Sequence, residues 1–312
     1  MTNIVLTFSK DKLNELKRYY EKHITKTPPN SLFLAKIDKV TISAYRSGKV
    51  MFQGANAEEE ASKWDEKTIV KPTLKKAASV NSHSYQPPKQ LFDEAHIGTD
   101  ETGTGDFFGP ITVCAVYLSK NNLFLLKDMG ITDSKTLTDE RITKLAVEMV
   151  RLGIPYSLLT LDNAKYNQLQ QRGWNQGKMK SILHQHAIEK LIKKLNGTSV
   201  NGILIDQFCQ PHSYMKHINS ERLSLAPNTF FMTKAESYST SVAAASIIAR
   251  AKFVREMDHL SEKYGFTIPK GASSKVDESA AYFIKKNGIE ELSNVAKIHF
   301  ANTEKAQRYL HK

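Results

Sequence analysis

Residues 97–110 read IGTDETGTGDFFGP, so the adjacent acids Asp100 and Glu101 are followed by a glycine-rich turn. The β-rich segment Ile111–Leu118 comes next, and together they predict two strands joined by that turn. Adjacent residues of a regular strand point to opposite faces, so both acids can serve one site only where the strand ends or bends. Glycines provide that freedom and let a polymer backbone approach closely. Taken alone, an acid pair in such a turn is more often a solvated loop than a metal site.

Two further acids lie near the ends of predicted elements. Asp206 directly follows the apolar run 203–205, which is typical of a strand buried on both faces. Open α/β sheets bind their ligands at the carboxyl ends of such strands. Glu236 precedes a helix whose alanines 243–245 would let it lie close against a sheet. The alternatives are a turn aspartate at 206 and a glutamate that compensates the helix dipole at 236.

Four carboxylates near the ends of elements are what a two-metal phosphoryl-transfer site requires. Hard oxygen ligands suit Mg²⁺ or Mn²⁺, whereas Zn²⁺ prefers His or Cys ligands. Two such ions can activate a water and stabilise the leaving oxygen of an in-line displacement. Lys178 and Lys180 are interpreted as a solvated face of a helix. Nothing in the sequence connects the histidines to the acids, so four of them are predicted to be structural or superficial: His184, His186, His212 and His217.

The rest of the chain divides into two predicted domains. Residues 1–70 show a strand, a helix capped by Ser9, a hairpin and a second helix after Asn56, which indicates a small α+β unit. The polar, Pro-containing stretch 71–94 is predicted to be a linker. In residues 95–312 strands and helices alternate, which favours an α/β domain built round a partly parallel sheet.

Composition favours a nucleic-acid-binding protein over a membrane or secreted one. The 312 residues are 40% apolar, and no apolar run approaches the roughly 18 residues that span a bilayer. Only two cysteines are present, so a disulfide framework is excluded. The net charge is +12, and residues 1–90 contribute +7 of it, with 16 Lys and Arg against 9 Asp and Glu. A basic surface attracts polyanions, nucleic acid first. We expect a cytoplasmic monomer without a protein partner.

The stretch 97–110 closely resembles the opening motif of bacterial type 2 ribonucleases H, specifically ribonuclease HIII. The resemblance continues in order through 133–137, 204–208, 234–237 with 242–250, 269–272 with 276–277, and 299–300. It implies a ribonuclease H-like α/β domain with a mixed sheet and flanking helices, preceded by a domain similar to the TATA-binding protein fold. It also implies an endonuclease that hydrolyses the RNA strand of RNA–DNA hybrids with Mg²⁺ or Mn²⁺, leaving 5′-phosphate and 3′-hydroxyl ends.

The resemblance also assigns roles to individual residues. The family's catalytic, metal-binding acids fall on Asp100, Glu101, Asp206 and Glu236. The segment that contacts substrate includes Ser134 and Lys135. Backbone groups of Gly103, Thr104 and Gly105 are suited to contact the 2′-hydroxyl that distinguishes RNA from DNA.

Three features favour ribonuclease HIII over its sister family, ribonuclease HII. The sister family usually carries Gly-Arg-Gly where this chain has Gly103-Thr104-Gly105, ends its quartet with Asp where this chain has Glu236, and generally lacks the N-terminal domain. Losing a bidentate Arg implies a preference for runs of ribonucleotides. The alternatives are HII-like excision of single ribonucleotides from DNA, a non-catalytic nucleic-acid-binding protein, and a metal-dependent phosphatase for small substrates.

Overall fold

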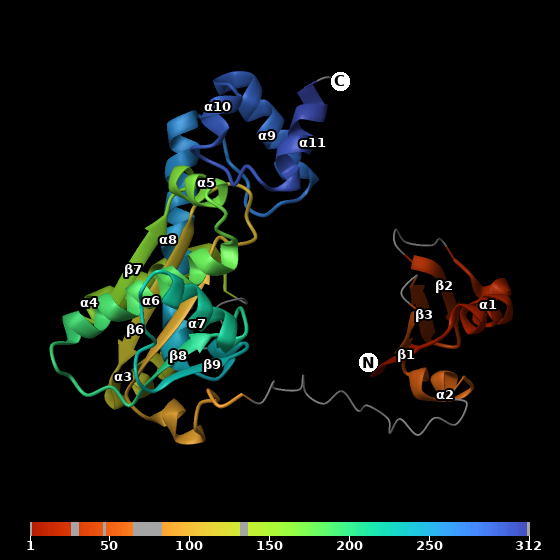
Figure 1. The fold of residues 1–312 in the computed structure, drawn as a ribbon, viewed down its shortest axis with the longest axis horizontal. Coiled ribbons are helices and arrows are strands. Elements are labelled where there is room, and N and C mark those ends of the chain that lie inside the picture. The colour runs from red at the N-terminus through yellow and green to blue at the C-terminus, as the bar shows by residue number, and fades with distance from the viewer. Residues whose placement is uncertain (1, 26–30, 46–47, 65–82, 132–136, 311–312) are drawn as a thin grey trace. The chain divides into compact units, whose positions relative to one another are not determined.

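The computed structural model describes residues 2–25, 31–45, 48–64, 83–131 and 137–310 (Figure 1). The chain divides into two units, Met1–Ser79 and Val80–Lys312, and each has a buried core of its own. None of the helices in the described ranges is long and apolar enough to cross a membrane.

The first unit is a four-stranded antiparallel sheet with two α-helices. The strands are β1 (Thr2–Thr7), β2 (Ser31–Ile37), β3 (Val40–Tyr45) and β4 (Lys49–Gly54), in the order β1-β4-β3-β2. The helices are α1 (Lys10–Tyr19), α2 (Ala57–Ser62) and the short 3-10 turn η1 (Glu21–His23). Leu16 of α1 and Ala61 of α2 share a buried core with Ile42 and Phe52, so both helices cover the same face of the sheet. The predicted α+β unit is confirmed, and Ser9 caps α1 by accepting a hydrogen bond from Lys12 N at 3.3 Å.

The second unit is built round a five-stranded mixed sheet, which confirms the predicted α/β class. Its strands are β5 (His96–Thr102), β6 (Ile111–Leu118), β7 (Tyr156–Leu161), β8 (Gly202–Asp206) and β9 (Thr229–Met232), in the order β7-β6-β5-β8-β9. The pairs β5–β6 and β6–β7 are antiparallel, whereas β5–β8 and β8–β9 are parallel. The carboxyl ends of β5 and β8 therefore lie side by side.

Helices cover both faces of this sheet (Figure 1). One face packs against α3 (Lys120–Asp128), α4 (Asp139–Arg151) and α8 (Thr240–Tyr264). The other packs against α6 (Gln176–Leu195) and α7 (Pro211–Ser220), with α5 (Asn163–Gln171) beside α6. The 3-10 helices η2 (Lys89–Asp93) and η4 (Ala235–Ser237) lie before β5 and α8.

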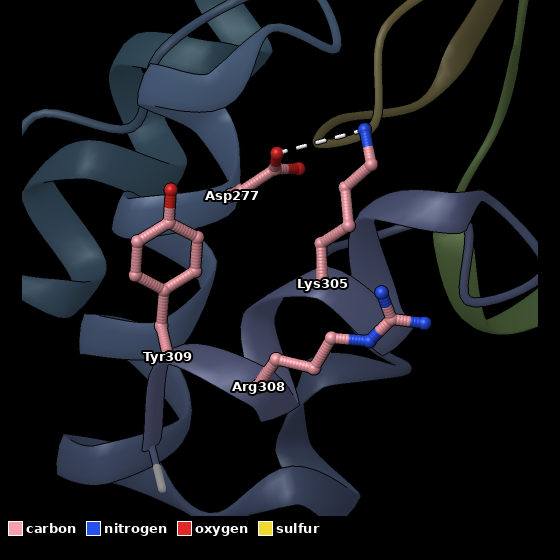
Figure 2. A pocket seen from close by; sticks show the side chains of 4 residues that line it. All are labelled: Asp277, Lys305, Arg308 and Tyr309. Atoms are coloured by element: carbon pink, nitrogen blue, oxygen red, sulfur yellow. Dashed lines mark ion pairs between the residues drawn. The ribbon is translucent and has the colours of Figure 1, made fainter. Parts of the chain in front are cut away.

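A cluster of C-terminal helices packs round Phe107 and Phe108: α9 (Ser274–Asn287), α10 (Ile289–Leu292) and α11 (Ala301–Leu310). A surface hollow of about 210 Å³ on this cluster is lined by Asp277, Lys305, Arg308 and Tyr309. Figure 2 shows these four side chains. Asp277 is buried, accepts a hydrogen bond from Asn302 Nδ2 at 2.5 Å and lies 3.7 Å from Lys305 Nζ. These contacts join α9 to α11, so Asp277 acts as a polar link between the two helices.

Helix α8 lies directly against β5. A Cβ atom on Gly98 would stand 2.2 Å from Val242 N and 2.3 Å from Ser241 C, so only glycine fits there. The alanines 243–245 are fully buried in the same contact. The prediction that small residues bring this helix close to the sheet is confirmed.

The second half of the predicted linker belongs to the folded second unit. Residues 71–82 lie outside the described part of the chain, but from His83 onward the prediction is wrong. Phe231 N donates to Tyr85 O at 2.9 Å, and the two rings meet edge to face. Leu91, in η2, is buried. Residues 84–85 form a turn and residues 89–93 form η2, and Tyr85 and Leu91 anchor them to the second unit, so composition alone does not reveal the packing.

Candidate active site

Three of the four predicted acids line one cavity of about 350 Å³ at the carboxyl ends of β5 and β8: Asp100, Glu101 and Asp206. The parallel pairing places Thr99 opposite Ile205, so Asp100 and Asp206 follow on neighbouring strands. The glycine-rich segment 102–106 and Arg250 of α8 complete much of the wall. This is where open α/β sheets bind ligands.

Asp100 and Glu101 reach the cavity from opposite faces of β5. Asp100 lies on the α8 side, where Ser246 hydrogen-bonds its carboxyl and Cys114 is its cross-strand neighbour. Glu101 lies on the α6 side, where it contacts Lys180 and His184. The two acids share a site because β5 ends at Thr102, as the strand geometry predicts.

The two carboxyls differ in their electrostatics. Burial, followed by the negative charges of Glu101 and Asp206, raises the pKa of Asp100 well above its usual range. Burial also opposes ionisation of Glu101, but hydrogen bonds and charge from His184 and Lys180 outweigh it and lower the pKa of that carboxyl. Crowded carboxylates of this kind are stabilised by a divalent cation, which relieves their mutual repulsion. The oxygen-only donor set therefore fits Mg²⁺ or Mn²⁺.

Asp206 and Glu236 are connected through η4. Ala235 N donates to Asp206 Oδ1 at 2.8 Å, and Glu236 is the next residue, buried at 3% exposure. Glu236 lies in η4, and Ser239 is the residue that caps α8, by accepting a hydrogen bond from Val242 N at 3.2 Å. Glu236 is not among the residues that line the cavity. Within the described ranges, no three Asp, Glu, His or Cys side chains already form a metal-binding group.

The sequence indicates that Lys180 is part of a solvated helix face, and nothing in it connects His184 with the acids. Both interpretations are wrong, because both side chains contact Glu101. His184 is fully buried; its Nδ1 lies 2.8 Å from Thr99 Oγ1 and its Nε2 lies 2.9 Å from Glu101 Oε2. Lys180 Nζ lies 2.9 Å from Glu101 Oε1. The available signal was their four-residue spacing, which puts both on one face of α6.

The glycine-rich loop is held in place by side chains from α6 and from the C-terminal segment. Gly103 has φ +93°, and a Cβ there would stand 2.1 Å from Pro110 O, whereas a Cβ on Gly105 meets nothing within 4 Å. Gln176 Nε2 donates to Thr104 O at 2.9 Å. Lys297 is fully buried and donates to Asp106 O and Gly109 O at 2.8 and 2.6 Å. Burial lowers the pKa of Lys297 to about 7.

Two further cavity residues, Ser246 and Arg250, come from α8, and Arg250 is held by Asp139, the first residue of α4. Arg250 Nη2 pairs with Asp139 Oδ1 at 2.8 Å, and Lys270 pairs with the other oxygen of Asp139. The predicted substrate residues Gly103, Thr104 and Gly105 all line the cavity. Ser134 and Lys135 lie outside the described residues.

Comparison with known proteins agrees with this site. A sequence profile described as Ribonuclease HII matches residues 97–303, and one described as a domain of unknown function matches residues 3–77. A protein named Ribonuclease HIII from Oceanobacillus iheyensis is 52% identical over 99% of this chain and 100% of its own length. The chain belongs to the ribonuclease HIII family. Another Ribonuclease HIII, from Bacillus pumilus, is 47% identical over 99% of this chain and all of its own.

The ribonuclease HIII fold is also present among solved structures. The crystal structure of Bst-RNase HIII in complex with Mn²⁺ is 39% identical, covers 99% of both chains and gives a TM-score of 0.69. The family and fold predictions are therefore confirmed. The chain is a hydrolase of the ribonuclease H class, which cleaves the RNA strand of RNA–DNA hybrids. Membership of this family rules out the non-catalytic binding protein and the small-substrate phosphatase. The Mn²⁺ complex agrees with use of a divalent metal.

Proposed function

We propose that Asp100, Glu101, Asp206 and Glu236 hold two divalent ions, Mg²⁺ or Mn²⁺, with which this ribonuclease HIII-family enzyme cleaves the RNA strand of RNA–DNA hybrids. The observation that carries the proposal is the convergence of three acids from two neighbouring strand ends on one cavity. Bound there, the ions would activate the attacking water and stabilise the leaving 3′ oxygen.

The protein's own groups support this chemistry in distinct ways. The backbone N–H of Ala235 donates to Asp206 Oδ1, which fixes the orientation of this carboxylate at the cavity wall. Glu236 completes the quartet from η4, one residue further along the chain. Arg250, oriented by Asp139, brings a positive charge to the cavity wall, where a phosphate of the substrate would be attracted.

The backbone of residues 103–105 is assigned to recognition of the ribose 2′-hydroxyl. The space beside Gly105 supports this role, because an open position on the cavity wall admits a polymer backbone. Thr104 cannot clamp a phosphate bidentately as an arginine does, so hydrolysis of ribonucleotide runs is favoured over excision of single ribonucleotides. Substrate contact by Ser134 and Lys135 stays a prediction from the family resemblance.

Gly105→Ala and Gly103→Ala are expected to separate substrate recognition from folding. Gly105→Ala should keep the wild-type melting temperature but lower kcat/KM for a hybrid on the order of 10-fold, because the methyl group displaces the substrate backbone. Gly103→Ala should instead cost about 1–3 kcal/mol of stability, since its backbone is left-handed and its Cβ would clash with Pro110 O. Melting curves and steady-state kinetics of both variants check this. Wild-type kcat/KM in Gly105→Ala would argue against recognition by this loop.

The identity of the product ends tests the reaction itself. Attack by water in line with the 3′ oxygen leaves a 5′-phosphate and a 3′-hydroxyl. Attack by the substrate's own 2′-hydroxyl would leave a 2′,3′-cyclic phosphate. A hybrid labelled on the RNA strand, cleaved in Mg²⁺ and analysed for its end groups, decides between them, and cyclic phosphate ends would overturn the proposed mechanism.

The first unit is assigned to capture of the hybrid. Helices α1 and α2 cover one face of its sheet, and the opposite face is open, with Val5 52% exposed and Lys36 and Lys49 exposed on the strands. The strand register places Thr7 beside Lys49 and Val5 beside Met51 on that open face. Together with the basic charge of residues 1–90, this supports binding of a polyanion. A monomeric state and a cytoplasmic location belong to the same proposal.

A further inference from the structure

The ammonium of Lys180 lies in a sheltered position at the edge of the acid site. Its side chain is only 12% exposed, and Nζ stands 2.9 Å from Glu101 Oε1. On its other side Nζ lies 4.1 Å from the centre of the Phe208 ring. The ring face attracts a cation, so two contacts hold the ammonium beside the carboxylate.

His184 holds the other oxygen of the same carboxylate in a different way. Its Nε2 lies 2.9 Å from Glu101 Oε2, and its Nδ1 lies 2.8 Å from the hydroxyl of Thr99. A neutral imidazole can donate from Nε2 while it accepts the hydroxyl proton at Nδ1. In its neutral form the ring orients Glu101 through this hydrogen bond alone, whereas the ammonium of Lys180 always brings a positive charge with it.

We propose that Lys180 competes with divalent cations for Glu101 and so weakens metal binding, whereas His184 orients Glu101 and strengthens it. This inference rests on the proposed function, since it takes Glu101 as a metal ligand. Any cation that Oε1 binds must lie within a few ångströms of Nζ, because Nζ is itself 2.9 Å from that oxygen. Two cations at that separation repel each other strongly in a sheltered site.

The charges round Glu101 determine how strongly Lys180 can lower the affinity for a metal ion. Asp100 and Asp206 line the same cavity as Glu101, and a cation bound there would be attracted by their carboxyl groups as well. Lys180 is the cation in contact with Glu101 on the α6 side, and the phosphates of a bound hybrid would bring compensating negative charge. Lys180 is therefore a positioning residue that keeps the affinity for metal low until the phosphates of a bound hybrid offset its charge.

The inference is tested by titrating the full chain with Mn²⁺ in the absence of nucleic acid and measuring the binding affinity by calorimetry. Lys180→Met removes the charge but keeps a long apolar side chain, and it should bind Mn²⁺ about 10-fold more tightly than wild type. Lys180→Arg keeps the charge and should bind like wild type. The matched control is Lys178→Met, since Lys178 lies on the same helix with similar exposure but pairs with Glu221 at 2.6 Å. Its affinity should be unchanged.

The second half of the inference is tested at His184. His184→Leu should weaken Mn²⁺ binding about 10-fold, and His184→Gln, whose amide can still donate to Glu101, should restore much of it. If a folded Lys180→Met variant binds Mn²⁺ no more tightly than wild type, Lys180 does not compete with the metal. If His184→Leu binds Mn²⁺ as tightly as wild type or more tightly, His184 does not strengthen metal binding. Asp206→Asn identifies the site titrated: if it leaves Mn²⁺ affinity at the wild-type value, the proposed metal site itself is wrong.

Discussion

Asp206→Asn and Asp100→Asn are each expected to abolish cleavage of an RNA–DNA hybrid, with a loss well beyond the roughly 10–100-fold that follows from changing a residue behind a metal ligand. Both acids line the cavity, and an amide has neither the charge nor the basicity to replace a carboxylate ligand of Mg²⁺. Removing the metal with excess chelator should have the same effect on wild type. Initial rates on a labelled hybrid, with and without Mg²⁺, measure both losses.

Asp106→Asn is the matched control for these variants. Asp106 also lines the cavity, but its Oδ1 accepts a hydrogen bond from Gly271 N at 2.6 Å, a bond that the amide oxygen of asparagine can keep. Its loss of rate should therefore be far smaller. Full activity of Asp206→Asn, or of wild type in chelator, would refute the assignment of the quartet.

The thermal stability of the metal-free protein tests independently whether the carboxyl of Asp100 is costly to ionise in the folded state. Burial and its acidic neighbours raise the pKa of Asp100 in the folded state, so ionisation of this carboxyl opposes folding above its unfolded pKa. In chelator at pH 7–8, Asp100→Asn should therefore melt at a higher temperature than wild type. The difference should shrink as the pH falls and wild-type Asp100 takes up its proton. Added Mn²⁺ should stabilise wild type more than the variant, and melting curves across pH measure all three effects.

The sequence predicted the parts of this structure that local patterns determine. Strand β6 occupies the predicted segment, and the acids at the ends of β5 and β8 meet because neighbouring parallel strands bring their carboxyl ends together. Helix α8 packs on Gly98 as its alanines indicated. Each of these elements follows from a short-range pattern, either an apolar, β-rich run or a stripe of small residues.

The parts that were missed depend on tertiary neighbours. The periodicity of α6 puts Lys180 and His184 on one helix face, but nothing in it says that Glu101 lies opposite. Strand β2 has apolar residues on both faces, with Leu32, Phe33 and Leu34 in succession, so it lacks the alternation that indicates a strand. Nothing in the sequence distinguishes Lys297 from a surface lysine. Only the structure shows that it donates hydrogen bonds to the loop carbonyls of Asp106 and Gly109.

Removal of the first unit should weaken capture of the hybrid and leave the chemistry largely intact. The deletion should end at Ser79, because residues from His83 onward are folded into the second unit through Tyr85 and Phe231. All four acids remain in the truncated chain. We expect KM to rise and the salt dependence of binding to flatten, by about 0.9 in log–log slope for each phosphate that the shortened chain no longer neutralises. Saturating hybrid should recover much of kcat.

Point variants in the full chain make the same test without truncation. Lys36→Ala with Lys49→Ala removes two charges from the open face of the sheet, whereas Lys17→Ala removes an exposed charge from α1, on the covered face. The first pair should weaken hybrid binding and lower the salt slope, and the α1 variant should do so much less, because only charges that meet phosphates release counterions. If the unit served only to stabilise the second unit, the truncated chain would lose melting temperature and kcat together. Its affinity and salt slope would then equal those of the full chain, and that result would defeat the capture role.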